Sequence, residues 1–514
     1  MQTTLLGVAI ALILALIAAL VGPYFVDWNQ FRPQFEAEAS RIIGAPVRVT
    51  GKLDALLLPT PTLRLYGVAV GEKNAPWVSA DKLDVEFSLG SLMRGEWRAS
   101  ELTLNGFSLD LGLDRKGRVQ LPSTAGRSNL GSLTIDRMNV AGQIVLHDAA
   151  SGGTLRIDDL TFSGDMRAIA GSMRGDGSFT LLGARTPFRM SSGQSTDGKG
   201  TRLHVTAEPG ERPRMVDIDG TLTFDNGAPN FDGVLVLTKA MDAKAAEQGQ
   251  PWKVTSRVKV NPSLVTFDQV EAAYGPDDNA LRLTGSGDMR FGTSPLLKLA
   301  LAARQLDADK LLANGSANAE PLRLLPALRV IVPSLPVLPL PAQIELSADQ
   351  VAVGGRPLLN VAATLQANDK SWTVGKFEMR APGATRVVAS GTISTPGPSA
   401  RFSGPVSIES SDPDVLTAWL QGRSDATYRN QKPLRLRGDA VIAADRIGLD
   451  GMKAEINGGK IDGSIALLTT ADNKTRLEAV LSAPSLDVES VSSLVSVLAG
   501  PQSAGQAAPL AGSL

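Results

Sequence analysis

Residues 102–113 read Leu-Thr-Leu-Asn-Gly-Phe-Ser-Leu-Asp-Leu-Gly-Leu, and this stretch decides the fold class. Apolar residues occupy every second position up to Leu104 and again from Phe107 onward, so the alternation changes phase at Asn105-Gly106. Because successive side chains of a strand point to opposite faces, such alternation predicts a strand with one apolar and one polar face. A turn or a β-bulge at Gly106 would keep both apolar sets on the same face.

The same alternation recurs along the chain, first in a run from Leu83 to Leu89 without a break. One-sided alternation is typical of antiparallel strands with one apolar and one solvated face. We therefore predict a mainly β protein, an elongated, open gutter (a β-groove) of repeated antiparallel strands over residues 46–320 and 342–498. The candidate residues of its apolar floor are Val85, Phe87, Leu89, Leu102, Leu104, Phe107, Leu109, Leu111, Leu113, Leu297, Leu299, Leu301, Leu434 and Leu436.

Short helices are expected where a strand runs into an aspartate, which happens four times, at Asp242, Asp307, Asp412 and Asp487. An aspartate at this position accepts hydrogen bonds from the first backbone N–H groups of a helix. The Asp-x-Asp pairs that begin at Asp307 and Asp412 could also be metal ligands. Capping explains all four copies, including the one followed by Lys244, so we predict structural caps and no metal site.

Glycine and proline divide the pattern. Alternating segments follow a glycine at residues 220, 287, 391, 438 and 463, which predicts a repeated unit of strands, a glycine turn and further strands. Residues 321–341 contain five prolines after position 325, too many for a regular helix or a central strand, so we expect an apolar connector there. Residues 499–514 have the composition of a flexible tail.

The N-terminus is apolar, since no charged residue precedes Asp27 and Leu5–Val21 is a continuous apolar run. With the residues up to 26 it reaches the ~20 residues that a helix needs to cross a bilayer. A cleaved signal peptide would carry basic residues before this run and a small-x-small site after it. Neither is present, so we predict an uncleaved transmembrane anchor over residues 1–26 and a short juxtamembrane helix over residues 27–45.

Composition disfavours several classes of function. The net charge is −1 with both signs interspersed, which gives no basic stripe for nucleic acid. There is no cysteine, and the two histidines, His147 and His204, lie in alternating segments where we expect them on a polar strand face. No phosphate-binding glycine loop is present. We therefore expect no catalytic residues, no cofactor and no enzymatic activity.

The first hundred residues resemble the AsmA-like family of bacterial envelope proteins. The resemblance is carried by the apolar anchor, by Phe31–Gly44, by Val49–Leu53, by Pro61–Val70, by Leu83–Trp97 and by Leu102–Leu109. It extends over most of residues 1–500 and is strongest before residue 120. It implies membership of a group of bridge-like lipid-transfer proteins. It also implies a single-pass anchor in the bacterial inner membrane, a body in the periplasm, and a role in phospholipid movement or outer-membrane upkeep.

Two hypotheses of function follow. In the first, the protein conducts phospholipid along an apolar β-groove, in which acyl chains take the place of a second protein layer. In the second, it is a scaffold or assembly factor whose sheet edges or polar face bind outer-membrane or other envelope proteins. Both hypotheses predict the same fold.

Overall fold

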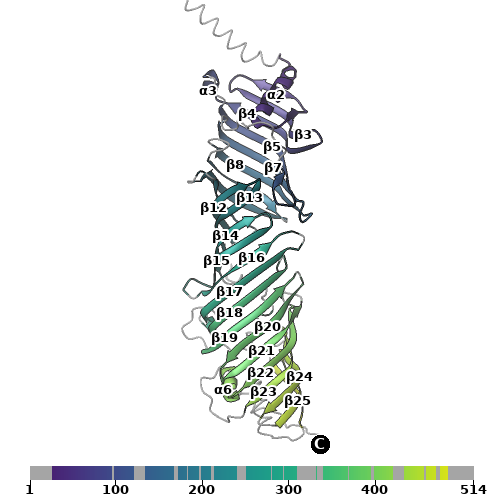
Figure 1. Ribbon diagram of the computed structural model, residues 1–514, viewed down its shortest axis with the longest axis vertical. Coiled ribbons are helices and arrows are strands. Elements are labelled where there is room, and N and C mark those ends of the chain that lie inside the picture. The colour runs from purple at the N-terminus through teal and green to yellow at the C-terminus, as the bar shows by residue number, and fades with distance from the viewer. Residues whose placement is uncertain are drawn as a thin grey trace, which may run out of the picture. The chain divides into compact units, whose positions relative to one another are not determined.

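The computed structural model shows a protein built mainly of strands (Figure 1). It describes residues 26–94, 98–120, 134–166, 172–181, 183–195, 198, 200–209, 214–239, 251–278, 280–292, 294–309, 332, 338, 340–368, 370–394, 399–420, 433–456, 459–469 and 475–483. Strands hold 73% of these residues, which confirms the prediction of a mainly β protein. The strands form a curled, open sheet, and the chain divides into two compact units.

The first unit comprises residues 1–247, 255–265 and 291–294. Its elements are η2 (Trp28–Phe31), α2 (Arg32–Ile43), β1 (Val47–Val49), β2 (Leu53–Leu56), β3 (Thr62–Glu72), β4 (Ala75–Phe87), α3 (Leu89–Met93), β5 (Arg98–Leu113), β6 (Val119–Gln120), β7 (Thr134–Asp148), β8 (Thr154–Met166), β9 (Met173–Leu181), β10 (Ala184–Gln194), β11 (Thr201–Ala207), β12 (Arg214–Asp225) and β13 (Ala228–Lys239). β1 and β2 both pair with β3, and β6 pairs with β5. The other strands pair in chain order from β3 to β13, with β7 next to β5.

The second unit comprises residues 248–254, 266–290 and 295–514. Its elements are β16 (Leu281–Arg290), β17 (Leu296–Asp307), β18 (Ala342–Val353), β19 (Arg356–Ala367), β20 (Ser371–Ala381), β21 (Thr385–Ser394), β22 (Arg401–Ser410), α6 (Pro413–Leu420), β23 (Leu434–Ile442), β24 (Arg446–Ile456), β25 (Gly459–Thr469) and β26 (Thr475–Ser482). Each strand pairs with the next along the chain. β14 (Trp252–Asn261) and β15 (Leu264–Tyr274) contribute residues to both units.

Of the strand pairings described above, two are parallel, which corrects the prediction of an antiparallel sheet. They are β5 with β7 and β17 with β18. Antiparallel neighbours can be joined by a short hairpin, whereas parallel neighbours need a connection that returns along the strand. The connections at residues 114–133 and 308–341 are long enough to do so. One-sided alternation is typical of antiparallel strands, but it does not fix the direction of any particular neighbour.

The N-terminal segment covers one end of the sheet in the first unit. Residues 27–45, expected as a single helix, form η2 followed by α2. α2 ends where Gly44 adopts a left-handed conformation with φ of 78°. Ile43 and Ala39 of α2 pack against Val47 of β1. Among the described residues, no helix is both long enough and apolar enough to cross a membrane. The predicted anchor lies outside them, apart from Val26.

Candidate functional site

The strand register of the first unit gathers the candidate floor residues on one face. Residues directly opposite each other in neighbouring strands share a face of the sheet. Val85 in β4 lies opposite Leu102 in β5, and Leu102 lies opposite Met138 in β7. Followed through β4 and β5, the face that we call the apolar floor of the first unit carries Val85, Phe87, Leu102, Leu104, Phe107, Leu109, Leu111 and Leu113.

The phase change at Asn105-Gly106 is a β-bulge. The pairing of β5 with β7 shifts register between Asn105 and Phe107, and Gly106 between them has φ of +63°. An added Cβ at Gly106 would lie 2.1 Å from Asp81 Oδ2, so this backbone position suits only glycine. The bulge returns Phe107 and Leu109 to the same face as Leu104, as the alternation predicted.

Leu89 does not belong to the strand, which corrects the prediction of an unbroken run through this residue. β4 ends at Phe87, and Leu89 begins α3. The Ser88 N–H donates to Arg98 O at 3.1 Å, and Ser88 O accepts from Ser91 N at 3.1 Å. These bonds turn the chain away from the sheet, so Leu89 lies on the surface and not on the floor.

The second unit has an apolar floor of the same kind. Leu297, Leu299 and Leu301 in β17 lie opposite Ala342, Ile344 and Leu346 in β18. Leu434 and Leu436 in β23 lie opposite Ser410 and Ile408 in β22. The pairing can be followed from β17 to β23, across register shifts in the β19–β20 and β20–β21 pairs, and it places all five predicted residues on one face.

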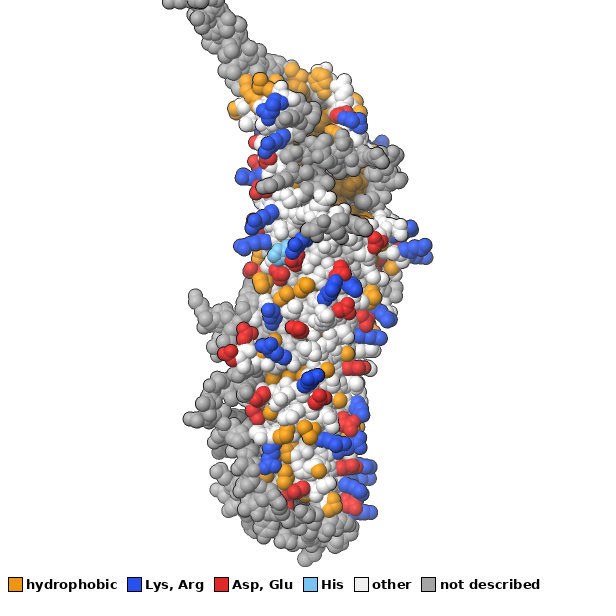
Figure 2. All heavy atoms as spheres, turned by 60° about the vertical axis from the view of Figure 1, so that its left-hand side comes forward, with side chains coloured by type: hydrophobic (Ala, Val, Ile, Leu, Met, Phe, Trp, Pro, Cys, Tyr) orange, Lys and Arg blue, Asp and Glu red, His pale blue; other side chains and the backbone are white. Residues whose placement is uncertain are grey.

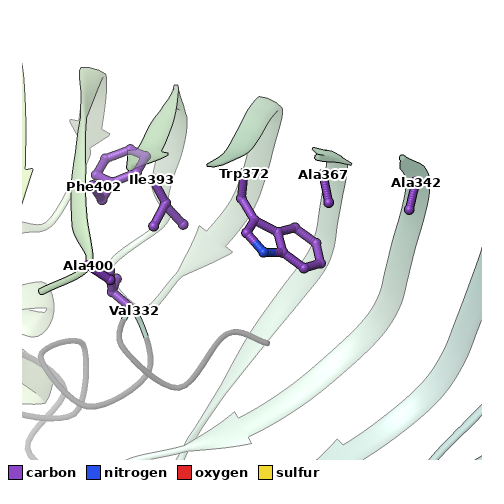
Figure 3. Packing of buried hydrophobic residues seen from close by; sticks show 7 residues of the cluster. All are labelled: Val332, Ala342, Ala367, Trp372, Ile393, Ala400 and Phe402. Carbon is purple, nitrogen blue, oxygen red and sulfur yellow. The ribbon is translucent and has the colours of Figure 1, made fainter. Parts of the chain in front are cut away.

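Burial along this floor differs between the ends of the strands and their middles. At one end, Ala342, Trp372 and Phe402 form a buried cluster with Val332 of the predicted connector, and Figure 3 shows these side chains on the same side of the strands. At the other end, strand residues such as Val353 are buried with Leu416 and Trp419 of α6. Between the two clusters, the floor side chains are only half-buried: Ile344, Leu346, Ala363, Leu365, Val374 and Phe377. The floor is therefore closed along its margins and partly accessible between them.

Glycines that were expected in turns between strands lie inside the strands, on the apolar face of the sheet, which corrects that prediction. Gly220, for example, is in the middle of β12, directly opposite Gly233 in β13. An added Cβ at either glycine would come within 2.7 Å of Cζ of Phe231, so the phenyl ring covers bare backbone. Aromatic rings are known to compensate for glycines in sheets in this way.

Two further phenylalanine rings in the described strands cover glycines, with a common sequence signal. Phe162 covers Gly164 and Gly175, and Phe402 covers Gly391 in β21. In each case the phenylalanine begins a Phe-x-Gly motif, at residues 162–164, 231–233 and 402–404. Residues two apart share a strand face, so this motif was the available signal for a floor of rings laid over glycines.

The opposite face is polar. Figure 2 shows basic and acidic side chains interspersed over one face of the molecule. Many form cross-strand ion pairs, such as Arg202 with Asp219 at 2.9 Å. The hydrogen bond from Arg202 lowers the pKa of the Asp219 carboxyl. Both histidines lie on this face as predicted: His147 Nε2 is 3.3 Å from Asp110 Oδ1, and His204 Nε2 is 2.9 Å from Asp217 Oδ2.

The predicted helix caps differ in their surroundings. Asp412 precedes α6, and its Oδ1 accepts a hydrogen bond from Val415 N at 3.2 Å. Asp307 is the last residue of β17, and helical residues follow it directly. Asp309, two residues later, accepts hydrogen bonds from the N–H groups of Gly354 and Gly355, both at 2.7 Å. These bonds fix the turn between β18 and β19. Asp242 and Asp487 lie outside the described residues.

No group of three or more histidine, aspartate or glutamate side chains in the described part of the chain is arranged to hold a metal ion. Comparison with known proteins gives one match. The model of the AsmA family matches residues 2–164, which include the N-terminal apolar run and the strands up to β8. No curated protein and no solved structure matches the chain.

Proposed function

We propose that this chain, an AsmA-like protein, is a membrane-anchored lipid carrier of the bacterial envelope. It binds the acyl chains of phospholipids on the apolar floors of its two units, and it supports the supply of lipid to the outer membrane. Residues 1–26 cross the inner membrane once, and the body lies in the periplasm. The AsmA match and the large curled sheet support a role of this general kind.

The observation that carries the proposal is the half-burial of the floor between two buried margins. An antiparallel sheet with one apolar face normally covers that face with a second layer. Here Ile344, Leu346 and Phe377 remain partly accessible, while Trp372 at one margin and Trp419 at the other are buried. Acyl chains placed along the middle rows would complete the missing contacts, at about 0.8 kcal/mol for each buried methylene.

The proposed role is non-enzymatic, because moving a lipid along a surface breaks no covalent bond. Contacts between acyl chains and aliphatic side chains are non-directional, so a lipid can slide from one strand to the next without losing hydrogen bonds. The Phe-x-Gly sites suit such movement, since rings lying on bare backbone present a flat apolar surface.

Lipid analysis of the purified full chain tests the proposal. We expect phospholipid to co-purify with it and to be detected by mass spectrometry after solvent extraction. Leu301 and Leu346 face each other on the floor, so Leu301→Arg with Leu346→Arg should abolish bound lipid. The matched control is Ser347→Arg on the polar face, which should retain it. A full chain that carries no lipid, but captures envelope proteins through its polar face, would favour the scaffold hypothesis and overturn the proposal.

A further inference from the structure

Exposed apolar side chains gather at one end of the first unit. They come from three segments that are separate in the sequence: the N-terminal turn, the loop after β2, and α3. We call them the apolar rim, and its members are Val26, Phe31, Leu57, Leu89 and Met93. Met93 is 82% exposed, more than any other large apolar side chain in the described part of the chain. Apolar side chains exposed together in this way usually mark a surface that binds a partner or a membrane.

Hydrogen bonds hold these three segments at the same end of the sheet. The Leu53 N–H of β2 donates to Asn29 Oδ1 of η2 at 3.2 Å, which seats the N-terminal turn on β2. The loop after β2 leads into β3, and Pro61 O in this loop accepts from the Phe87 N–H at 2.8 Å. Phe87 is the last residue of β4, so α3 begins beside the loop.

The short helix α3 presents Leu89 and Met93 to the surface. Ser91 in the middle of α3 is only 2% exposed. Leu89 and Met93 lie two residues before and after it and are among the exposed residues. Arg94 follows directly, and its N–H donates to Ser91 O at 3.0 Å. A basic residue beside an exposed apolar pair suits the anionic headgroups of a membrane surface.

In α3, the apolar rim begins two residues after Phe87 of the apolar floor. Phe87, one residue before the turn into α3, packs against the buried cluster of Val85, Ala99 and Ile135. This cluster lies at the end of the strands from which α3 projects. An apolar path therefore leads from the surface of α3 onto the floor.

The rim also lies where the chain would leave the membrane. The described chain begins at Val26, and no charged residue precedes Asp27. If residues 1–26 span the bilayer, η2 begins two residues beyond it, and aromatic side chains such as Trp28 and Phe31 are typical of the membrane interface.

From these observations we infer that the apolar rim rests in the interface of the membrane that holds the anchor, and that lipid passes over α3 and Phe87 onto the floor. The partner of this surface is a phospholipid bilayer. This inference rests on the proposed membrane anchor and adds the site at which lipid is loaded.

The absence of native cysteine permits a direct test with the full chain reconstituted in vesicles of phosphatidylethanolamine and phosphatidylglycerol. Met93→Cys and Leu57→Cys are each labelled with an environment-sensitive dye. We expect both dyes to show blue-shifted emission and quenching by spin-labelled lipids. The matched control is Met215→Cys in β12 of the same unit, which is 39% exposed, shares the polar face with Asp217 and Asp219, and lies seven strands from β4, about 34 Å at 4.8 Å for each strand. Its dye should show neither effect.

A dye at position 93 that behaves like the one at position 215 would overturn the inference. A blue shift at position 93 without quenching by lipid would also overturn it, because it would show that protein covers the rim. Circular dichroism of each labelled chain checks that the sheet is intact. Lipid extraction from the same samples separates this inference from the proposed function: bound lipid with an unquenched rim refutes only the inference, whereas absence of bound lipid refutes the proposed function.

Discussion

The phenyl ring of Phe231 lies over Gly233, two residues further along β13, so closely that a Cβ on Gly233 would be 2.7 Å from the ring carbon Cζ. The same ring covers Gly220 on the neighbouring strand. Two glycines without side chains thus make room for one ring to lie flat on the sheet. The floor at this point is neither bare backbone nor a close-packed core.

Gly233→Ala should destabilise the first unit by about 1–3 kcal/mol, because the added methyl group must displace the ring or the backbone. The Cβ would also lie 2.4 Å from Asp219 O, which cannot move as easily as a side chain. Gly193→Ala in β10 is the matched control, since nothing lies within 4 Å of its added Cβ. Urea unfolding of both variants checks this, and equal midpoints would show that the ring does not depend on the glycine.

Floor and margin should respond differently to truncation. Leu109 is half-buried on the floor, so Leu109→Ala should cost about 1 kcal/mol or less. Ile135 is 1% exposed and belongs to the buried cluster with Val85 and Ala99 at the strand ends of the first unit. Ile135→Ala should therefore cost about 2–5 kcal/mol through the cavity that it leaves. If denaturant unfolding gives Leu109→Ala the larger cost, the floor is packed against protein and has no space for lipid.

Charge on the floor should prevent lipid binding without unfolding the strand. Leu109→Arg places an ion among acyl chains, at about 2–4 kcal/mol by analogy with the lipid face of membrane barrels. Asp110→Arg is the matched control on the polar face, where Asp110 pairs with His147. Lipid mass spectrometry should find lipid with Asp110→Arg and none with Leu109→Arg. Equal lipid content in the two variants would contradict the proposed floor.

Asp412 should matter for stability and not for metal binding. Asp412→Ala removes the oxygen that accepts the Val415 N–H and should cost about 1 kcal/mol. The loss should be the same with added divalent cations and with a chelator, as measured by thermal unfolding. A melting temperature that rises with cations in the unmutated chain, but not in Asp412→Ala, would restore the metal-ligand interpretation.

The ion pairs of the polar face should make stability fall in acid. Hydrogen bonds from Lys376 and Arg386 lower the pKa of Glu378. A carboxyl whose pKa is lowered on folding stabilises the fold above its unfolded pKa of about 4.3, and this contribution disappears as the pH falls through the folded pKa. Unfolding midpoints between about pH 6 and pH 3 should therefore decline less steeply for Glu378→Gln. Parallel profiles for the two chains would show that the pair does not contribute.

Much of the floor was predictable from alternation, because a period of two fixes which side chains share a face. The phase change at Gly106 was also predictable as a turn or a bulge, and the structure shows that it is a bulge. Three features were not. The parallel pairings depend on how long connections return along the sheet, and Leu89 continues the alternation although backbone hydrogen bonds of Ser88 turn the chain into α3. The third is the position of Gly220, whose place under a ring depends on a partner in another strand.

Site-specific photocrosslinking along β5 tests the central claim most directly. A photoreactive amino acid placed at residues 107 to 111 in turn, in the full chain within bacterial membranes, samples both faces of one strand. The account predicts crosslinks to phospholipid at Phe107, Leu109 and Leu111 and none at Ser108 and Asp110, following the alternation of the strand. Crosslinks to lipid from both faces alike, or to protein alone at Leu109, would contradict it.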